Sequence, residues 1–171
     1  IKLHIIFQEF GDLISNGKWR NWLIEAKLVG RVQVPRCYFP VICTFADIQL
    51  HTFSDAGTNA YCAVVYIRAE INGQAYVSLV QAKSKVAPIK ELTIPRLEMQ
   101  AAVTGSQISN TIEKEIGIPI AKRFFWCDST IVLAWINTTQ KLNSYIGCRI
   151  SKILDCLNRN EWNWIPTKYN F

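Results

Sequence analysis

The sequence lacks the features that define several large classes of protein. No apolar run approaches the roughly 18 residues that a transmembrane helix needs, so we expect no membrane span. The six cysteines include no CxxC pair, and neither histidine stands at metal-ligand spacing, so we expect no zinc site. Cys62 and Cys127 instead lie within apolar runs, which is typical of buried free thiols. This pattern favours a reducing, cytoplasmic location.

Charged residues are also scarce, and their balance is one-sided. They make up 19% of the 171 residues, with 19 Lys and Arg against 13 Asp and Glu, so the net charge is +6 and the pI about 9.1. Half of the residues are apolar, which indicates a globular domain. A basic domain of this kind favours a polyanionic partner such as nucleic acid.

Alternation of apolar and polar residues predicts three consecutive strands. The first runs over 48–53 and leads into Asp55, and the second runs over 61–68. The dipeptide Asn72-Gly73 is a strong hairpin signal, and the third strand follows it over 74–83. Strands joined in this way form an antiparallel meander.

The second half of the chain alternates helices with strands. Pro95 suits the first turn of a helix that ends at Gly117, and this helix carries small residues that allow close packing on a sheet: Ala101, Ala102 and Gly105. The remaining predicted elements are a strand over 123–127, helices over 131–136 and 142–157, and a strand over 162–165. The order βββαβααβ predicts an α/β fold with a mixed five-stranded sheet and helices packed over it.

The tryptophans follow the same periodicities. Four of them alternate with polar residues or fall at helical spacing, and we interpret them as mainly core: Trp126, Trp135, Trp162 and Trp164. Near the N-terminus, Trp19 and Trp22 form a helical stripe with Leu23 and Ala26. Such a stripe is typical of a core or of an interdomain contact.

Three carboxylates stand where a strand ends or a helix begins. Asp55 follows the first strand, Glu98 lies in the first turn of the long helix, and Asp128 ends the fourth strand. If the first and fourth strands are neighbours, the three side chains converge at one edge of the sheet. Clustered negative charge is costly unless a cation offsets it, so this pattern indicates bound divalent metal. Two Mg²⁺ ions at such a site are suited to phosphodiester hydrolysis.

Basic and hydroxyl residues near these carboxylates are candidates for substrate binding. The basic candidates, predicted to lie mainly in a loop, are Lys83, Lys85, Lys90 and Arg96. They are suited to the phosphate backbone of a duplex, although an ordinary solvated loop would have the same composition. Ser129 and Thr130, at a helix N-terminus beside Asp128, are candidates for phosphate binding, with a simple helix cap as the alternative role of Ser129.

Four motifs carry a specific resemblance to a known family. They are SDAGTNAYCAVVYIR, AKSKVAPIKELTIPRLEMQAAV, FFWCDSTIVLAWI and WNWIPTKYN. In this order they closely resemble the ribonuclease H region of BEL/Pao-type LTR retrotransposon polyproteins, a region also labelled as the Pao retrotransposon peptidase family. Residues 1–43, with KWRNWL and VQVPRCYF, resemble the segment that connects a reverse transcriptase to this region. We therefore expect a connection segment over 1–43 and a ribonuclease H-like domain over 44–171.

The resemblance implies a function and a site. Asp55, Glu98 and Asp128 correspond to three of the four metal-binding carboxylates of ribonucleases H. The implied activity is endonucleolytic hydrolysis of the RNA strand of RNA–DNA hybrids by a two-metal mechanism, with Mg²⁺ or alternatively Mn²⁺, and with a reverse transcriptase upstream in cis. The implied location is cytoplasmic, with a virus-like particle as an alternative. In the family, the motif that ends here at Asn170 continues through a variable residue to Ala-Asp. We therefore expect the fourth carboxylate two positions beyond Phe171, in a longer polypeptide of which this chain is a piece truncated at its C-terminus.

Two other functions stay open at this point. Without the fourth carboxylate, the chain would be a catalytically inactive fragment that binds nucleic acid or has a structural role. Alternatively, Asp55-Ala56-Gly57 superficially resembles the Asp-Ser/Thr-Gly signature of aspartic peptidases. That chemistry needs two Asp side chains that share a proton, and the sequence contains one such motif.

Overall fold

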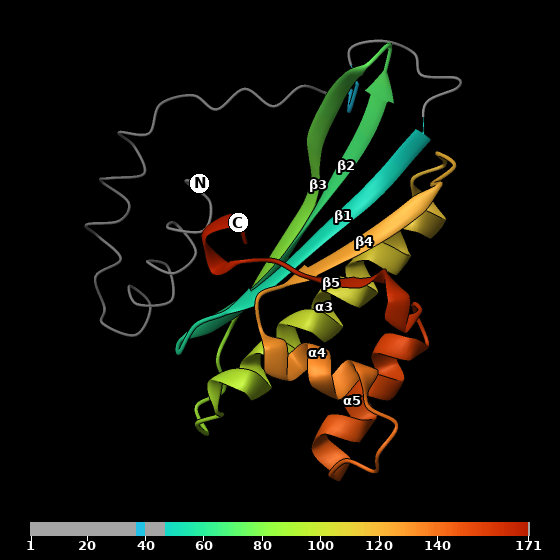
Figure 1. The fold of residues 1–171 in the computed structure, drawn as a ribbon. Helices are drawn as coiled ribbons and strands as arrows, with labels where there is room; N and C mark the ends of the chain where they lie inside the picture. The colour runs from blue at the N-terminus through green and yellow to red at the C-terminus, as the bar shows by residue number, and fades with distance from the viewer. Residues whose placement is uncertain (1–36, 40–46, 171) are drawn as a thin grey trace, which may run out of the picture.

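The computed structural model describes residues 37–39 and 47–170 (Figure 1). The predicted connection segment, including the stripe that begins at Trp19, lies outside the described residues apart from 37–39. The described elements follow the predicted order. They are β1 (Asp47–Ala56), β2 (Ala60–Ile71), β3 (Gln74–Val86), α3 (Ile94–Glu115), β4 (Lys122–Cys127), α4 (Thr130–Asn137), α5 (Ser144–Leu154), η1 (Arg159–Glu161), β5 (Trp162–Trp164) and η2 (Thr167–Tyr169).

The strands form one mixed sheet in the order β3-β2-β1-β4-β5. β1, β2 and β3 pair antiparallel, whereas β4 is parallel to both β1 and β5. The β2–β3 hairpin turns at Asn72 and Gly73, whose φ angles are +53° and +79°. A tight hairpin needs positive φ at both central residues, and these are the residue types that adopt it most readily. The predicted mixed five-stranded sheet and the predicted hairpin are confirmed.

Strand β3 is longer than the sequence predicts. It extends to Val86, so Lys85 belongs to the strand together with Lys83, and the prediction that Lys85 lies in a loop is wrong. Both side chains are exposed, and β2 is the strand that pairs with β3. Exposed lysines are common on edge strands because they discourage pairing with other chains. The polar composition of residues 84–86 and their neighbours is therefore that of an exposed edge strand, which the sequence pattern did not distinguish from a loop.

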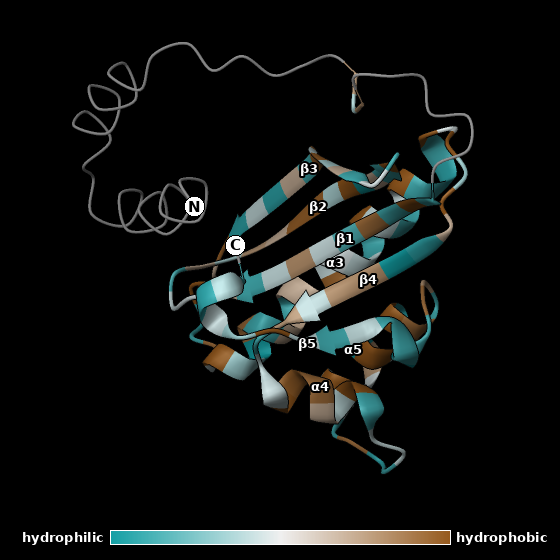
Figure 2. Cartoon of the chain, turned by 45° about the horizontal axis from the view of Figure 1, so that its top comes forward, coloured by the Kyte–Doolittle hydropathy of each residue, from teal (hydrophilic) through white to brown (hydrophobic). Residues whose placement is uncertain are grey.

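Helices α3, α4 and α5 pack over one face of the sheet (Figure 2). Helix α3 approaches the sheet closely at Gly105. A Cβ atom there would lie 3.0 Å from Thr52 Cγ2 and 3.3 Å from Ala63 Cβ. This close approach confirms that the small residues of the helix allow tight packing on β1 and β2.

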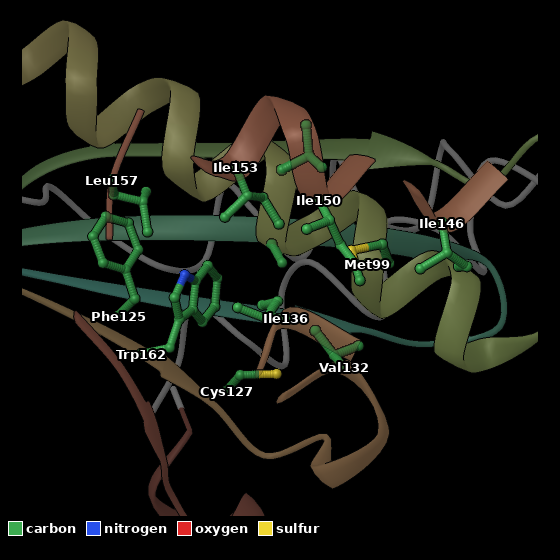
Figure 3. Packing of buried hydrophobic residues seen from close by; sticks show 12 residues of the cluster. Met99, Phe125, Cys127, Val132, Ile136, Ile146, Ile150, Ile153, Leu157 and Trp162 are labelled. Atoms are coloured by element: carbon green, nitrogen blue, oxygen red, sulfur yellow. The ribbon is translucent and has the colours of Figure 1, made fainter. Parts of the chain in front are cut away.

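A hydrophobic core lies between β4, β5 and the three helices (Figure 3). The side chains of Phe125 and Trp162 pack together with their ring centroids 5.2 Å apart. Met99 of α3 and Ile136 of α4 contribute fully buried side chains to the same cluster. Core roles are thus confirmed for Trp162, which is buried, and for Trp135, which packs against the cluster.

The opposite face of the sheet carries a stack of aromatic rings. His51 stacks on Phe124 with ring centroids 4.9 Å apart, and Trp126 stacks on Phe53 at 6.2 Å. The Trp126 indole N–H donates to His51 Nδ1 over 3.2 Å. Trp126 is therefore half-buried on this face rather than part of the core beneath the helices.

Among the described residues, no helix has the length and apolar character needed to cross a membrane.

Candidate active site

Sheet topology brings Asp55 and Asp128 to the same edge. In the parallel β1–β4 pair, Ser54 lies opposite Cys127, and each is followed directly by one of the two acidic residues. The carboxyl ends of parallel strands meet at one edge of a sheet, which is where side chains from different strands can act together. The predicted adjacency of the first and fourth strands is confirmed.

Glu98 reaches this edge from the first turns of α3. Its Oε2 atom accepts a hydrogen bond of 2.6 Å from the hydroxyl of Ser129. Ser129 directly follows Asp128, so the bond ties the start of α3 to the junction between β4 and α4. Glu98 is half-buried, and its position is therefore set by packing as well as by this bond.

The electrostatics of Glu98 also reflect the neighbouring carboxylates. Burial raises the pKa of Glu98 above its ordinary value, and the hydrogen bond from Ser129 lowers it in part. The charges of Asp128 and Asp55 raise this pKa further, because like charges disfavour ionisation. Both aspartates thus lie close enough to Glu98 for their charges to raise its pKa.

The donor chemistry of this edge fits a hard divalent cation. Carboxylate oxygens are the protein ligands that Mg²⁺ prefers, and a few suffice because the ion keeps several waters. In the part of the chain that the structure describes, no three His, Cys, Asp or Glu side chains are gathered closely enough to form a complete metal site. The three carboxylates therefore converge at one edge without forming a closed ligand set.

Ser129 makes two hydrogen bonds within the protein, of which the sequence predicted one. As predicted, it is the N-cap of α4, where its hydroxyl accepts a hydrogen bond from the N–H of Val132. The same hydroxyl donates to Glu98, so both its donor and an acceptor position are used within the protein. The first residue of α4, Thr130, has an exposed side chain beside it. Phosphate binding by either residue stays a prediction.

The predicted basic residues lie on β3, on the connection to α3 and on α3 itself. Lys85 pairs with Tyr61, which pairs with Ala56, so Lys85 is two strands away from the end of β1 at the same end of the sheet. Two strand spacings are about 10 Å. Lys83 and Lys90 are exposed, and the Arg96 guanidinium lies 5.1 Å from the ring centroid of Tyr145 in α5.

Polar and aromatic side chains form a cluster between α3 and α5 that the sequence did not predict. The Arg149 guanidinium lies 3.4 Å from the centroid of the Tyr145 ring. Gln100 of α3 hydrogen bonds the Tyr145 hydroxyl over 3.1 Å. Gln100 and Tyr145 are 45 residues apart in sequence, and no local pattern signals their contact.

The end of β5 and the segment that follows it also differ from the prediction. Trp164 is 55% exposed, so its prediction as a core residue is wrong. Its indole N–H donates to the backbone carbonyl of Asp128 over 3.2 Å. Asn170 is buried, and its amide donates to the carbonyl of Ser54 over 3.1 Å. The alternation of Trp162 and Trp164 predicts a shared buried face, but the strand ends at Trp164 and its ring emerges there.

Comparison with known proteins identifies the family. The family model described as the Pao retrotransposon-like RNaseH-like domain matches residues 12–129. The chain belongs to this family. Both Asp55 and Asp128, together with the whole of β1 to β4, fall within the matched region of the Pao retrotransposon-like domain. No curated protein matches the chain in sequence.

Several similar solved structures are RNases H. RNase H1 from the halophilic archaeon Halobacterium salinarum NRC-1 is 12% identical, with a TM-score of 0.44 over 72% of this chain and 88% of that one. The N-terminal RNase H domain of Rv2228c from Mycobacterium tuberculosis is 12% identical, with a TM-score of 0.47 over 72% and 86%. LC11-RNase H1 in complex with an RNA/DNA hybrid is 14% identical, with a TM-score of 0.45 over 72% and 88%. Similarities at this level do not bear on the chemistry of this chain.

Proposed function

We propose that this Pao retrotransposon-like domain hydrolyses the RNA strand of RNA–DNA hybrids, as part of a polyprotein with a reverse transcriptase in cis. The observation that carries the proposal is the convergence of Asp55, Glu98 and Asp128 at one edge of the sheet, where the two aspartates raise the pKa of Glu98. Neighbouring carboxylates of this kind are costly unless a cation offsets their charge, so the arrangement favours a bound divalent metal. Membership of an RNaseH-like family supports the assignment of the reaction.

Each carboxylate has a distinct task in this proposal. Asp55 and Asp128 supply oxygen donors from rigid strand ends, and Glu98 supplies a third from α3. Ser129 holds the Glu98 carboxylate in place through its 2.6 Å hydrogen bond. Mg²⁺, or alternatively Mn²⁺, bound by these residues would stabilise the charge that develops on the attacking and leaving oxygens of the phosphodiester.

Basic residues would hold the duplex beside this edge. Lys85 lies at the same end of the sheet as Asp55, and Lys83, Lys90 and Arg96 extend positive charge along β3 and into α3. Contacts of lysine and arginine with phosphates position a duplex without reading its bases. Discrimination of RNA from DNA would then depend on the ribose 2′-hydroxyl and on duplex shape.

The experiment is a cleavage assay on a hybrid with a labelled RNA strand and Mg²⁺. It compares Asp55→Asn with a matched control, Asp155→Asn, because Asp155 is exposed at the C-terminal end of α5. We expect Asp55→Asn to reduce the rate by about 100-fold or more, as the loss of a group that stabilises transition-state charge does. Asp155→Asn should cleave like the wild type.

The assay includes a form of the chain extended at its C-terminus by Ala-Asp, the continuation that the family pattern predicts. Cleavage by this form that depends on Asp55 supports the proposal. If neither form cleaves the hybrid, or if Asp55→Asn cleaves at the wild-type rate, the proposal fails. Cleavage of a peptide substrate that Asp55→Asn abolishes would favour the peptidase alternative instead.

A further inference from the structure

The segment over 164–170 connects the ends of the two strands that carry the aspartates. At its start, the N–H of Ile165 donates to the carbonyl of Cys127 over 3.2 Å, so the segment begins beside the end of β4. At its other end, the amide of Asn170 donates to the carbonyl of Ser54, one residue before Asp55. Figure 2 shows the last described turn, η2, beside the tip of the β1 arrow. The segment therefore lies along the edge at which the carboxylates converge.

Trp164 presents its ring at this edge. The indole is anchored through its N–H to the carbonyl of Asp128, yet the residue is 55% exposed. Ile131, in the first turn of the following helix α4, is 47% exposed. Large aromatic side chains bury most of their surface in an ordinary fold, and a fixed, exposed ring is typical of a contact surface.

Lys168 and Tyr169 add a positive charge and a second ring to the same segment. The Lys168 ammonium lies 4.7 Å from the centroid of the Tyr169 ring. Both residues are exposed, and within the described part of the chain Lys168 makes no ion pair with a carboxylate. The 3-10 turn is closed by hydrogen bonds from Tyr169 N to Pro166 O and from Asn170 N to Thr167 O. A cation held on a short, hydrogen-bonded turn is well suited to bind a phosphate.

We propose that Trp164 and Lys168 form a nucleotide-binding surface beside Asp128. The indole stacks on a base or sugar of a nucleic-acid strand, and the ammonium contacts a phosphate of the same strand. Stacking on an exposed aromatic ring and pairing with phosphate are the two contacts that bind nucleic acids without regard to sequence. The identity of the strand, the RNA of a hybrid, rests on the proposed function. The binding surface itself does not require cleavage.

A purely structural role for Trp164 makes a different prediction. If the residue only anchors β5, its N–H bond to Asp128 is what matters, and any substitution that removes this bond should have the same effect. If the ring stacks on a nucleotide, Trp164→Phe should retain binding although it loses the N–H, whereas Trp164→Leu should not. The pair of variants therefore separates the two roles.

The test measures the Kd of a fluorescent RNA–DNA hybrid by anisotropy, using chains that also carry Asp55→Asn so that the hybrid stays intact. We expect Trp164→Leu to raise the Kd about 5- to 150-fold, the range that the loss of one stacked base produces. Trp164→Phe should stay within about threefold of the parent, since a phenyl ring also stacks on bases. Lys168→Ala should raise the Kd and reduce its salt dependence by the contribution of about one phosphate contact. Lys114→Ala, at the exposed far end of α3, is the control and should leave binding unchanged.

A second measurement does not depend on affinity. A hybrid that carries 5-iodouracil in its RNA strand, irradiated on the full-length chain, should cross-link to the peptide that contains Trp164. Equal binding by Trp164→Leu and the parent, equal losses in Trp164→Leu and Trp164→Phe, or a cross-link elsewhere would overturn the inference. Failure of the proposed function has a separate signature, since the wild type would then bind the hybrid with these same dependences and leave it uncleaved.

Discussion

The pKa of Glu98 reflects the proximity of Asp55 and Asp128. Its pKa is raised by burial and by the charges of Asp128 and Asp55, and the hydroxyl of Ser129 offsets only part of this effect. The places of the three carboxylates at element ends in the sequence predicted that they converge at one edge of the sheet. The hydrogen bond from Ser129 to Glu98 was not predictable, because the two residues are 31 positions apart and the bond depends on how α3 lies on the sheet.

The raised pKa predicts how stability depends on pH. Because the pKa of Glu98 is higher in the folded state than in the unfolded state, the folded chain binds more protons between these two values, and stability falls as the pH rises through this window. Glu98→Gln removes this penalty and keeps an acceptor for Ser129. In metal-free buffer we expect Glu98→Gln to unfold about 1–4 °C higher than the wild type at pH 7, with no difference once the pH is below the ordinary pKa of Glu.

The control is Glu115→Gln, at the exposed end of α3, which should not change the unfolding temperature. Excess Mg²⁺ should reverse the order of the wild type and Glu98→Gln, because a bound cation favours the ionised carboxylate. A Glu98→Gln variant that is less stable than the wild type at pH 7 without metal would contradict the electrostatic account.

Cysteine reactivity provides a second test at the residue scale. Burial raises the pKa of Cys127 to about 12, and the charges of Asp128 and Glu98 contribute to the increase. Burial likewise raises the pKa of Cys62 to about 11. Because the thiolate is the reactive form, iodoacetamide at pH 8 should modify exposed Cys148 in the folded chain and leave Cys127 and Cys62 unmodified until denaturant is added. Mass spectrometry of the labelled peptides checks this, and modification of Cys127 at the rate of Cys148 would mean that the carboxylate edge is open to solvent.

At the scale of elements, α3 positions Glu98 by lying close to the sheet. Pro95 near the start of the helix and the small residues along it predicted both its beginning and its packed face. The same reasoning failed for the end of β3 and for Trp164. At both places a strand extends beyond the part of the sheet that the helices cover. Alternation of apolar and polar residues along a strand does not show where this helical cover ends.

Two glycines in helices provide a matched comparison. Gly105→Ala places a Cβ 3.0 Å from Thr52 Cγ2, so we expect it to lower the free energy of unfolding by about 1–3 kcal/mol. Gly147→Ala in α5 places a Cβ with no atom within 4 Å, so we expect it to raise that free energy by about 0.5–1 kcal/mol through helix propensity. Urea denaturation measures both. Stabilisation by Gly105→Ala would contradict the close packing of α3 on β1, which is what places Glu98 at this edge of the sheet.

In the molecule as a whole, the strand order places β1 beside β4. This brings Asp55 and Asp128, which are 73 positions apart in sequence, to the same edge of the sheet. That adjacency follows from a meander succeeded by a helical crossover, which is why the order of elements in the sequence was enough to predict it. The aromatic stack on the opposite face was not predictable in the same way. His51 and Trp126 have no mutual signal in sequence, and their contact exists only because the two strands are paired in register.

The most direct test of the central claim compares two duplexes of identical sequence, an RNA–DNA hybrid and an RNA–RNA duplex, incubated with the chain extended by Ala-Asp and Mg²⁺. We expect that the RNA strand of the hybrid is cut, that the RNA–RNA duplex stays intact, and that both Mg²⁺ chelation and Asp128→Asn stop the reaction. An intact hybrid, or cleavage that persists in Asp128→Asn, would contradict the claim.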